Sequence, residues 1–300
     1  MWPVQLLYQV KGAKRLKRLT WSVADVAFPF QLVMDALQED CWPDLCELSV
    51  GDPTCSDQDL AGVLGALTMR KLTALELTRG HFGSFTYNCI RDRYFGHLRD
   101  LSIGQCLGAT SAMVQEILTE CVHLIGLDAQ HVFVRDIATA QKPWGCLRLQ
   151  RLTMYIAKQA EDEPGWEGLV FEQVAKLRML RTLDLQRDPH CMYLDDEPRP
   201  PEILNLETLD FRLTSQDGSI DSSTSGSGDL RCWSSLVLMR DFSFNGDRQN
   251  LGMKEVSWMM DHWGDLTCVS GDFKAVEGGD CKELNYLFLQ KGIAHYADVL

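Results

Sequence analysis

The stretch LRTLDL, residues 180–185, has apolar residues at its first, fourth and sixth positions. In a β-strand successive side chains point to opposite faces, so Leu183 and Leu185 can enter a core while Thr182 and Asp184 face outward. A single stretch of this kind is a weak indication of fold. It becomes informative when the same pattern returns at a regular spacing along the chain.

The apolar-x-x-apolar-x-apolar pattern recurs along most of the chain, on average about every 27 residues. The matching segments are LKRLTW at 16, LCELSV at 45, LTALEL at 72, LRDLSI at 98, LIGLDA at 124, LQRLTM at 149, LRTLDL at 180, LETLDF at 206, MRDFSF at 239, WGDLTC at 263 and LNYLFL at 284. The fifth residue of each segment is polar except in the last, where it is Phe288, and the residue three places before each segment is always apolar. This regularity predicts eleven short parallel strands, one per repeat.

Helix-like stretches lie between these segments. The clearest are SDQDLAGVLGALTM (56–69), TSAMVQEILTEC (110–121) and EGLVFEQVAKLRML (167–180). In the second of them Thr110 can cap the helix, and Val114, Ile117 and Leu118 share one apolar stripe. A strand followed by a returning helix makes one coil, and stacked coils predict an α/β solenoid with a parallel sheet along one face.

The repeats resemble the leucine-rich repeat family, in its intracellular ribonuclease-inhibitor-like and cysteine-containing types. LRDLSIGQC at 98–106 matches the family pattern most nearly, with Cys106 in the final slot, and ECVHLIGLDA at 120–129 is similar to its helix-to-strand joint. The resemblance covers about residues 13–290. It implies a single right-handed α/β horseshoe over residues 1–300, with the strand of each repeat on the concave face.

Three inserts break the period. Residues 158–168 lengthen one repeat, residues 187–202 replace a helix, and residues 214–231 are polar and rich in Gly and Ser. Because such a composition cannot bury an apolar face, we expect a flexible insert at 214–231.

Composition restricts the class of protein. The chain is 45% hydrophobic with a formal net charge of −13, and it has no apolar run long enough to span a membrane. Its acidic surface disfavours nucleic acid, although residues 11–18 carry a basic cluster that could be a nuclear address, a lipid-headgroup patch or a solvated face. The 11 cysteines include no C-x-x-C pair. We therefore expect reduced thiols in the cytoplasm or nucleus and no contact with membrane.

The sequence contains none of the common nucleotide, zinc-protease or nucleophile-elbow motifs, so we expect a protein without enzymatic activity, cofactor or metal. Asp184 and Asp210 occupy the same position in consecutive segments, and paired carboxylates can act as acid and base in glycoside hydrolysis. The alternative, which we favour, is two solvated acids on an open sheet.

The family resemblance implies a protein-binding scaffold. Many intracellular relatives are substrate receptors of cullin-type ubiquitin ligases and carry an F-box module before the repeats. Only fifteen residues precede the first segment, which is too short for that module. The chain could therefore be a truncated relative, a paralogue that lost the F-box, or an adaptor of another kind. The alternative function is a Ran-type GTPase activator or another regulator of an enzyme.

The outward positions of the central segments predict the binding surface on the concave face. Its residues are Arg151, Tyr155, Asp184, Gln186, Asp210, Arg212 and Asn245. An acidic centre at Asp184 and Asp210 would suit a partner protein with a basic surface, with Tyr155 as the anchor. The alternatives are binding through the loops at the rim or the convex side. We expect the chain itself to be a monomer.

Overall fold

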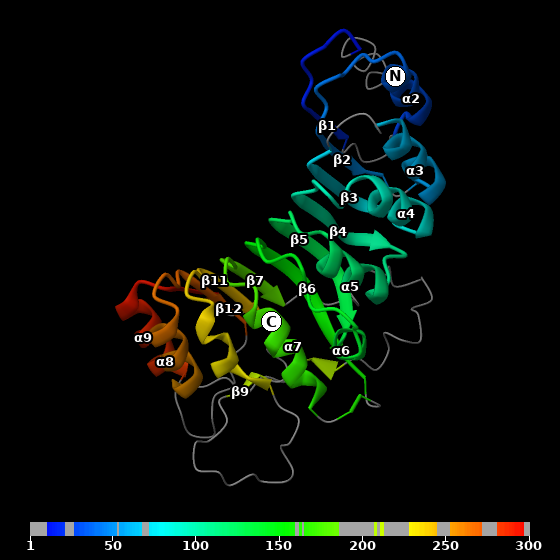
Figure 1. Ribbon diagram of the computed structural model, residues 1–300. Coiled ribbons are helices and arrows are strands. Elements are labelled where there is room, and N and C mark those ends of the chain that lie inside the picture. The colour runs from blue at the N-terminus through cyan, green and yellow to red at the C-terminus, as the bar shows by residue number, and fades with distance from the viewer. Residues whose placement is uncertain are drawn as a thin grey trace. The chain divides into compact units, whose positions relative to one another are not determined.

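The computed structural model describes residues 11–21, 27–52, 54–67, 72–159, 162–163, 165–185, 207–208, 211–212, 228–244, 253–271 and 281–296. In these ranges short parallel strands alternate with helices, which confirms the predicted α/β class (Figure 1). The chain forms two compact units, Met1–Gln130 and His131–Leu300.

The first unit contains strands that pair in parallel and in chain order. They are β1 (Arg18–Trp21), β2 (Glu47–Gly51), β3 (Ala74–His81), β4 (Asp100–Leu107) and β5 (Gly126–Phe133), whose last residues enter the second unit. The helices between them are α2 (Phe30–Gln38), α3 (Asp57–Ala66), α4 (Ser84–Arg93) and α5 (Ser111–Glu120). These helices lie along one side of the strands and leave the other side uncovered (Figure 1).

The second unit repeats this arrangement with parallel neighbours β6-β7-β11-β12-β13. The strands are β6 (Arg151–Lys158), β7 (Thr182–Leu185), β11 (Asp241–Phe244), β12 (Cys268–Ser270) and β13 (Ala294–Tyr296). The helices are α6 (Val134–Ala138), α7 (Trp166–Ala175), the 3-10 helix η3 (Leu230–Ser235), α8 (Met253–His262) and α9 (Cys281–Lys291). A helix lies between β6 and β7, between β11 and β12 and between β12 and β13, as the repeat pattern predicts, whereas β8, β9, β10 and η3 lie between β7 and β11.

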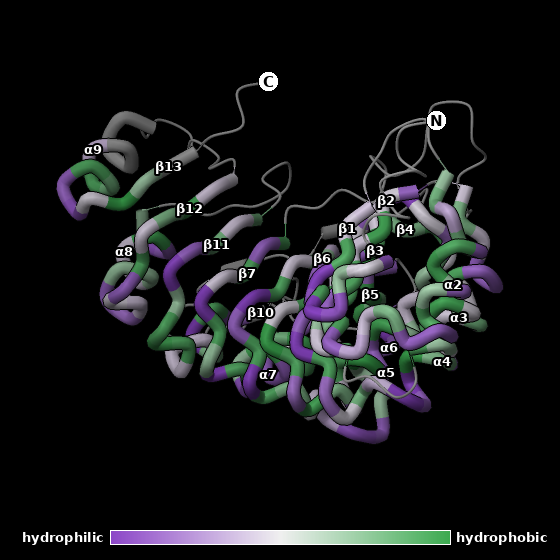
Figure 2. Tube along the Cα trace, turned by 90° about the horizontal axis from the view of Figure 1, so that it is seen from above, coloured by the Kyte–Doolittle hydropathy of each residue, from purple (hydrophilic) through white to green (hydrophobic). Residues whose placement is uncertain are grey.

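The core forms where the repeat pattern places it. Leu180, Leu183 and Leu185 are buried, whereas Asp184 between them is half-exposed. The position three residues before the strand segment is also buried in successive repeats, as at Cys146 and Leu177. Figure 2 shows the resulting alternation of hydrophobic and hydrophilic residues along the coils. The cysteines in this register are core residues, since a thiol packs as a small hydrophobe.

A backbone contact recurs at the start of β2, β3, β4, β5, β7, β11 and β12, and we call it the strand-entry carbonyl. The carbonyl of the second residue of a segment accepts two N–H groups from the next strand. Arg181 O, for example, accepts from Arg240 N (2.7 Å) and Asp241 N (3.0 Å). The same contact is made by the carbonyls of Lys17, Cys46, Thr73, Arg99, Gln150 and Arg240. It fixes the register of neighbouring repeats through main-chain atoms, and the hydroxyls of Thr73 and Thr267 add a bond to the carbonyls of Cys46 and Arg240 (3.2 Å each).

Helix starts follow the capping residues that the sequence supplies. The Thr110 side chain accepts the N–H of Met113 (3.3 Å) at the start of α5, and Ser56 accepts the N–H of Asp59 (3.1 Å) at the start of α3. Such caps satisfy amides that have no partner inside the helix. None of the helices in the described ranges is both long and apolar enough to cross a membrane.

The segment LETLDF at 206 is not the strand that the sequence predicts. β7 pairs directly with β11, in the register Thr182↔Asp241 and Asp184↔Ser243. Glu207–Thr208 instead forms β8, which is antiparallel to the end of β6, and Phe211–Arg212 forms β9, parallel to β10 (Gly228–Asp229). The prediction fails because the hydrogen-bonding edge of β7 that it needs is occupied by β11.

The last two segments also differ from the prediction. β12 begins at Cys268, which pairs with Asp241, so the repeat starts at Leu266 rather than at Trp263. Residues 284–289 belong to helix α9, and the final strand is β13. Phe288 is 1% exposed and Leu289 is 77% exposed, because a helix places residues differently from a strand. Phe288 is thus a helix core residue and does not cover a strand edge.

The predicted inserts are described only in part. Residues 187–202 lie outside the described residues, as does the insert 214–231 up to residue 227. The last residues of that insert form β10 and the beginning of η3, where Leu230 is fully buried. In the insert 158–168, Lys158 ends β6 and Trp166 begins α7.

Candidate functional site

The strands β6, β7 and β11 present a row of polar side chains on the face opposite the helices. Register places Arg151 beside Thr182 and Asp241, and Thr153 beside Asp184 and Ser243. We call this group the strand-face patch, and its residues are Arg151, Thr153, Thr182, Asp184, Asp241 and Ser243. Arg151 is exposed and the other five are half-exposed. Neighbouring strands are about 4.8 Å apart, so the six residues form one continuous surface.

Hydrogen bonds fix one acid of the strand-face patch. Asp241 Oδ2 accepts from Thr182 Oγ1 (3.3 Å), and Asp241 Oδ1 accepts from Thr267 Oγ1 (3.0 Å). Both carboxylate oxygens are therefore held in a defined orientation, with threonine donors from the preceding coil and from the turn before β12. Asp184 lies on the adjacent strand, one pair further along. The two acids and Arg151 give this surface mixed charge.

The structure contradicts the prediction that Tyr155 anchors a partner. Tyr155 is 5% exposed and packs with Phe133 and Ala157. The predicted alternation holds for the first half of β6, but the strand continues to Lys158, and Met154 to Ala157 are all buried. β8 pairs with the end of β6, at Ala157↔Thr208. This half of β6 is covered on both faces, so its residues belong to the core.

The other predicted site residues are brought together only in part. Arg151 and Asp184 share the strand-face patch, as expected. Arg212 lies in β9, which is not beside β7, so the predicted acidic pair of Asp184 with Asp210 on adjacent strands is wrong. Gln186, Asp210 and Asn245 lie outside the described residues.

The strand-face patch contains both hydrogen-bond donors and acceptors. Its side chains are two carboxylates, three hydroxyls and a guanidinium, and the hydroxyl of Thr182 is engaged with Asp241. In the described ranges there is no cluster of three or more His, Cys, Asp or Glu residues that could hold a metal ion. The glycoside-hydrolysis alternative required Asp184 and Asp210 to face one another on adjacent strands, which the pairing of β7 with β11 excludes.

The first unit has an equivalent polar row on β1 to β5. Arg18 and Glu47, side by side on β1 and β2, form an ion pair. Ser102 Oγ donates to Asp128 Oδ2 (2.8 Å) across β4 and β5. These polar groups are paired with one another across neighbouring strands. We therefore interpret the row as a solvated surface whose side chains stabilise one another.

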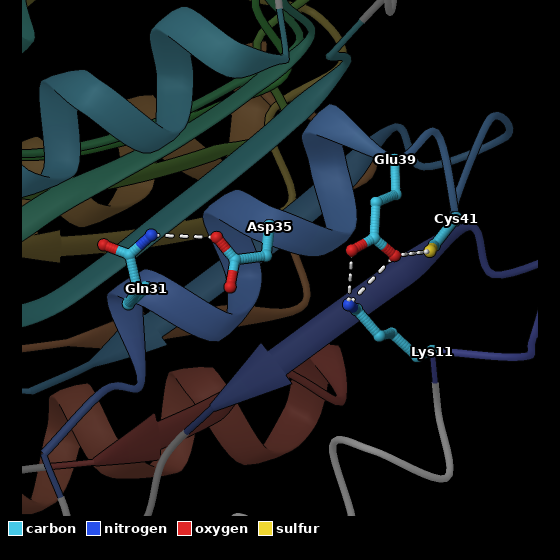
Figure 3. A network of polar contacts seen from close by, with 5 residues as sticks. All are labelled: Lys11, Gln31, Asp35, Glu39 and Cys41. Atoms are coloured by element: carbon cyan, nitrogen blue, oxygen red, sulfur yellow. Dashed lines mark hydrogen bonds and ion pairs between the residues drawn. The ribbon is translucent and has the colours of Figure 1, made fainter.

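A polar network near the start of the described chain is structural. Lys11 Nζ lies 3.0 Å from both carboxylate oxygens of Glu39 at the end of α2, and the Cys41 thiol donates to the same carboxylate at 3.7 Å (Figure 3). The hydrogen bond to Glu39 raises the pKa of Lys11. Gln31 Nε2 donates to Asp35 Oδ1 (2.8 Å), one turn along α2. These contacts tie the segment before β1 to α2.

A second polar cluster joins α3 to α4. The carboxylate of Asp57 accepts the N–H groups of Gly83, Phe85 and Thr86, each at 2.9 Å. Burial would raise the pKa of Asp57, but the hydrogen bonds from Thr86, Phe85 and Gly83 outweigh it and lower the pKa. Asp57 thus caps the following helix from the repeat before it. The sequence shows Asp57 only as a first-turn acid of its own helix, so this role was missed.

Other surface features were missed because the sequence does not reveal exposure. Leu147, Met179 and Val237 are exposed although the pattern around them is apolar. They lie in the short turns before β6, β7 and β11, outside the six-residue segments. Their common position, within the two residues between the apolar residue three places before the segment and the segment itself, is the signal in the sequence that could have found them.

No family model matches the chain, and no curated protein matches it.

Proposed function

We propose that the chain is a protein-binding repeat domain that recognises its partner through the strand-face patch. One observation carries the proposal: three adjacent strands present Arg151, Thr153, Thr182, Asp184, Asp241 and Ser243 in register on a face that the helices of the same unit leave uncovered. A flat surface of closely spaced, oriented polar groups suits the polar contacts of another protein surface.

The charge of the patch supports a partner with basic groups. Asp241 is oriented by two threonine hydroxyls, and Asp184 lies on the adjacent strand. A Lys or Arg of the partner placed between the two carboxylates would form charge-assisted hydrogen bonds. Arg151 at the edge of the patch would favour an acidic group of the partner at that point, which gives the contact an orientation.

The experiment is affinity capture from native extract followed by mass spectrometry, with the wild-type chain and the variant Asp184→Lys/Ser243→Lys. These two positions lie side by side in the register and have no role in the core. Glu76→Lys is the matched control, since Glu76 is the exposed fifth residue of its segment in the first unit. We expect the double variant to lose the main partner and the control to retain it. Capture of the same partner by a folded double variant would refute the proposal.

We further propose that the repeat is of the leucine-rich type and that the partner is a substrate or a component of a ubiquitin ligase, in the cytoplasm or nucleus. The support for this finer assignment is the resemblance of LRDLSIGQC at 98–106 and the cysteines in core register. Pull-down against cullin adaptors tests it. A GTP-hydrolysis assay with a Ran-type GTPase tests the alternative, and we expect no stimulation.

A further inference from the structure

The turns that precede β6, β7 and β11 have the same construction. The carbonyl three residues before the segment accepts the N–H of the first residue of the segment. Leu149 N donates to Cys146 O (3.0 Å), Leu180 N to Leu177 O (2.8 Å) and Met239 N to Leu236 O (3.0 Å). Both ends of each turn are buried. The two residues between them form the tip of a β-turn and are held away from the core.

These turn tips expose large apolar side chains. Leu147 is 51% exposed, Met179 is 41% exposed and Val237 is 56% exposed. They lie before β6, β7 and β11, which are neighbours in one parallel sheet. Consecutive tips therefore follow one another at about the spacing of strands, roughly 5 Å. Single exposed apolar residues are ordinary, but a row of them at one edge of a sheet indicates an interaction surface.

Arginines alternate with these apolar residues. Arg148 and Arg178 are the other residues at two of the tips, and Arg181 and Arg240 are the residues immediately before β7 and β11. Arg240 N donates to Arg181 O (2.7 Å), so these two residues are direct neighbours. All four are exposed, and none of the four guanidinium groups has an ion-pair partner within the described part of the chain. We call the three apolar residues and four arginines the turn edge.

The turn edge differs from equivalent turns elsewhere in the protein. In the first unit the tips are Lys14-Arg15, Pro43-Asp44, Gly96-His97 and Val122-His123. None of these combines an arginine with an exposed aliphatic side chain. The next turn of the second unit, before β12, has Gly264 and Asp265 at its tip, so the edge ends there. Among the described turns, an exposed aliphatic tip residue with an arginine at the tip or in the second position of the following segment occurs before β6, β7 and β11, which are neighbouring strands, in a chain with a formal net charge of −13.

We propose that the turn edge binds an extended acidic segment of a partner protein, in which Asp or Glu residues alternate with aliphatic ones. Neighbouring arginines repel one another in the free protein, and a partner's carboxylates would relieve that repulsion with charge-assisted hydrogen bonds. Aliphatic side chains of the partner would cover Leu147, Met179 and Val237. A phosphate backbone would satisfy the arginines but leave the apolar residues exposed, and the acidic remainder of the chain would repel it. The turn edge shares no residue with the strand-face patch, although Arg181 and Arg240 directly precede Thr182 and Asp241, and different variants test the two proposals.

The test is fluorescence anisotropy with the full chain and a fluorescein-labelled synthetic peptide of repeated Glu-Glu-Leu triplets. We expect a Kd below about 1 mM that weakens as salt is added. Arg181→Glu/Arg240→Glu should weaken binding at least tenfold, to about the limit of detection, because attraction becomes repulsion. Leu147→Ser/Val237→Ser should weaken it about threefold to tenfold through loss of apolar contact.

The matched control is Arg99→Glu, which reverses the charge at the position equivalent to Arg181 in the first unit, beside a turn without aliphatic residues. It should leave the Kd unchanged, and near-wild-type circular dichroism shows that each variant is folded. Several results would overturn the proposal: a Kd above about 1 mM, equal binding by the Arg181→Glu/Arg240→Glu variant, or equal binding of a Lys-Lys-Leu peptide. Tighter binding of a single-stranded oligonucleotide than of the acidic peptide would assign the turn edge to nucleic acid instead.

Discussion

Asp57 and Gly83 are predicted to be energetically coupled, because a single carboxylate closes the contact between α3 and α4. Asp57→Ala removes the acceptor of three backbone N–H groups, of Gly83, Phe85 and Thr86. Loss of a helix cap costs about 1 kcal/mol, and the amide of Thr86, whose residue is fully buried, adds about 1 to 2 kcal/mol when unpaired. We expect the free energy of unfolding to fall by about 2 to 3 kcal/mol.

Gly83→Ala should have a similar cost for a different reason. A Cβ at Gly83 would stand 2.4 Å from Asp57 Oδ2 and 2.8 Å from its Cγ, so the carboxylate would have to leave its position. The backbone of Gly83 has φ −103°, which any residue can adopt, so no conformational strain is involved. In the Asp57→Ala background the contact is absent. Gly83→Ala should then change stability by less than about 1 kcal/mol.

Urea unfolding of the four proteins of this double-mutant cycle gives the coupling energy, which we expect to be about 2 kcal/mol. Hydrogen exchange of the Phe85 and Thr86 amides should accelerate in each single variant. Gly62→Ala is the control, since Gly62 lies in α3 with nothing within 4 Å of an added Cβ, and it should stabilise by about 0.5 to 1 kcal/mol. Equal destabilisation by Gly83→Ala in both backgrounds would refute the reasoning.

Three other outcomes follow from the structure. Lys158→Met should destabilise by about 3 kcal/mol in urea unfolding, because the Glu167 carboxylate is 5% exposed and would lose its cation; a change below about 0.5 kcal/mol would contradict this. Asp52 accepts hydrogen bonds from Phe28 and Thr54, and these bonds outweigh burial and lower its pKa below the ordinary 3.8. Its contribution to stability is therefore complete above pH 3.8 and is lost as the pH falls through the lowered pKa. Asp52→Asn should flatten the acid limb of the pH–stability curve. Burial raises the pKa of both Cys55 and Cys146 to about 12, so iodoacetamide at pH 8 should modify them, by mass spectrometry, only after denaturation.

The parts of the fold that the sequence predicts correctly are those where two independent patterns coincide. At LRTLDL, the alternation within the strand and the apolar residue three places earlier, Leu177, give the same register, and the structure confirms both. At residue 263 the pattern selects the wrong start, because WGDLTC matches it while LTCVSG at 266 ends in Gly271. The actual register is set by the backbone pairing of Cys268 with Asp241, which the apolar pattern does not show.

The remaining errors arise from contacts between distant parts of the chain. LNYLFL fits a strand pattern and a helix pattern equally, since apolar residues three apart lie on one face of a helix as well. LETLDF does not enter the parallel sheet, because β11 forms the hydrogen bonds with the edge of β7 that LETLDF would need. Tyr155 has an outward position by alternation, yet Phe133 covers it. The binding site could therefore be placed on the right strands, but not residue by residue.

The strand-entry carbonyl has a consequence for how readily this surface can change. Because main-chain N–H groups make the contact in every case, it does not require a particular side chain at that position, although the Thr73 hydroxyl adds a bond to Cys46 O (3.2 Å); seven repeats carry Lys17, Cys46, Thr73, Arg99, Gln150, Arg181 and Arg240 there with the same pairing. Only proline is forbidden, since it lacks the N–H that the preceding carbonyl requires. Mutations at this position can therefore change the binding specificity of the surface without changing the fold.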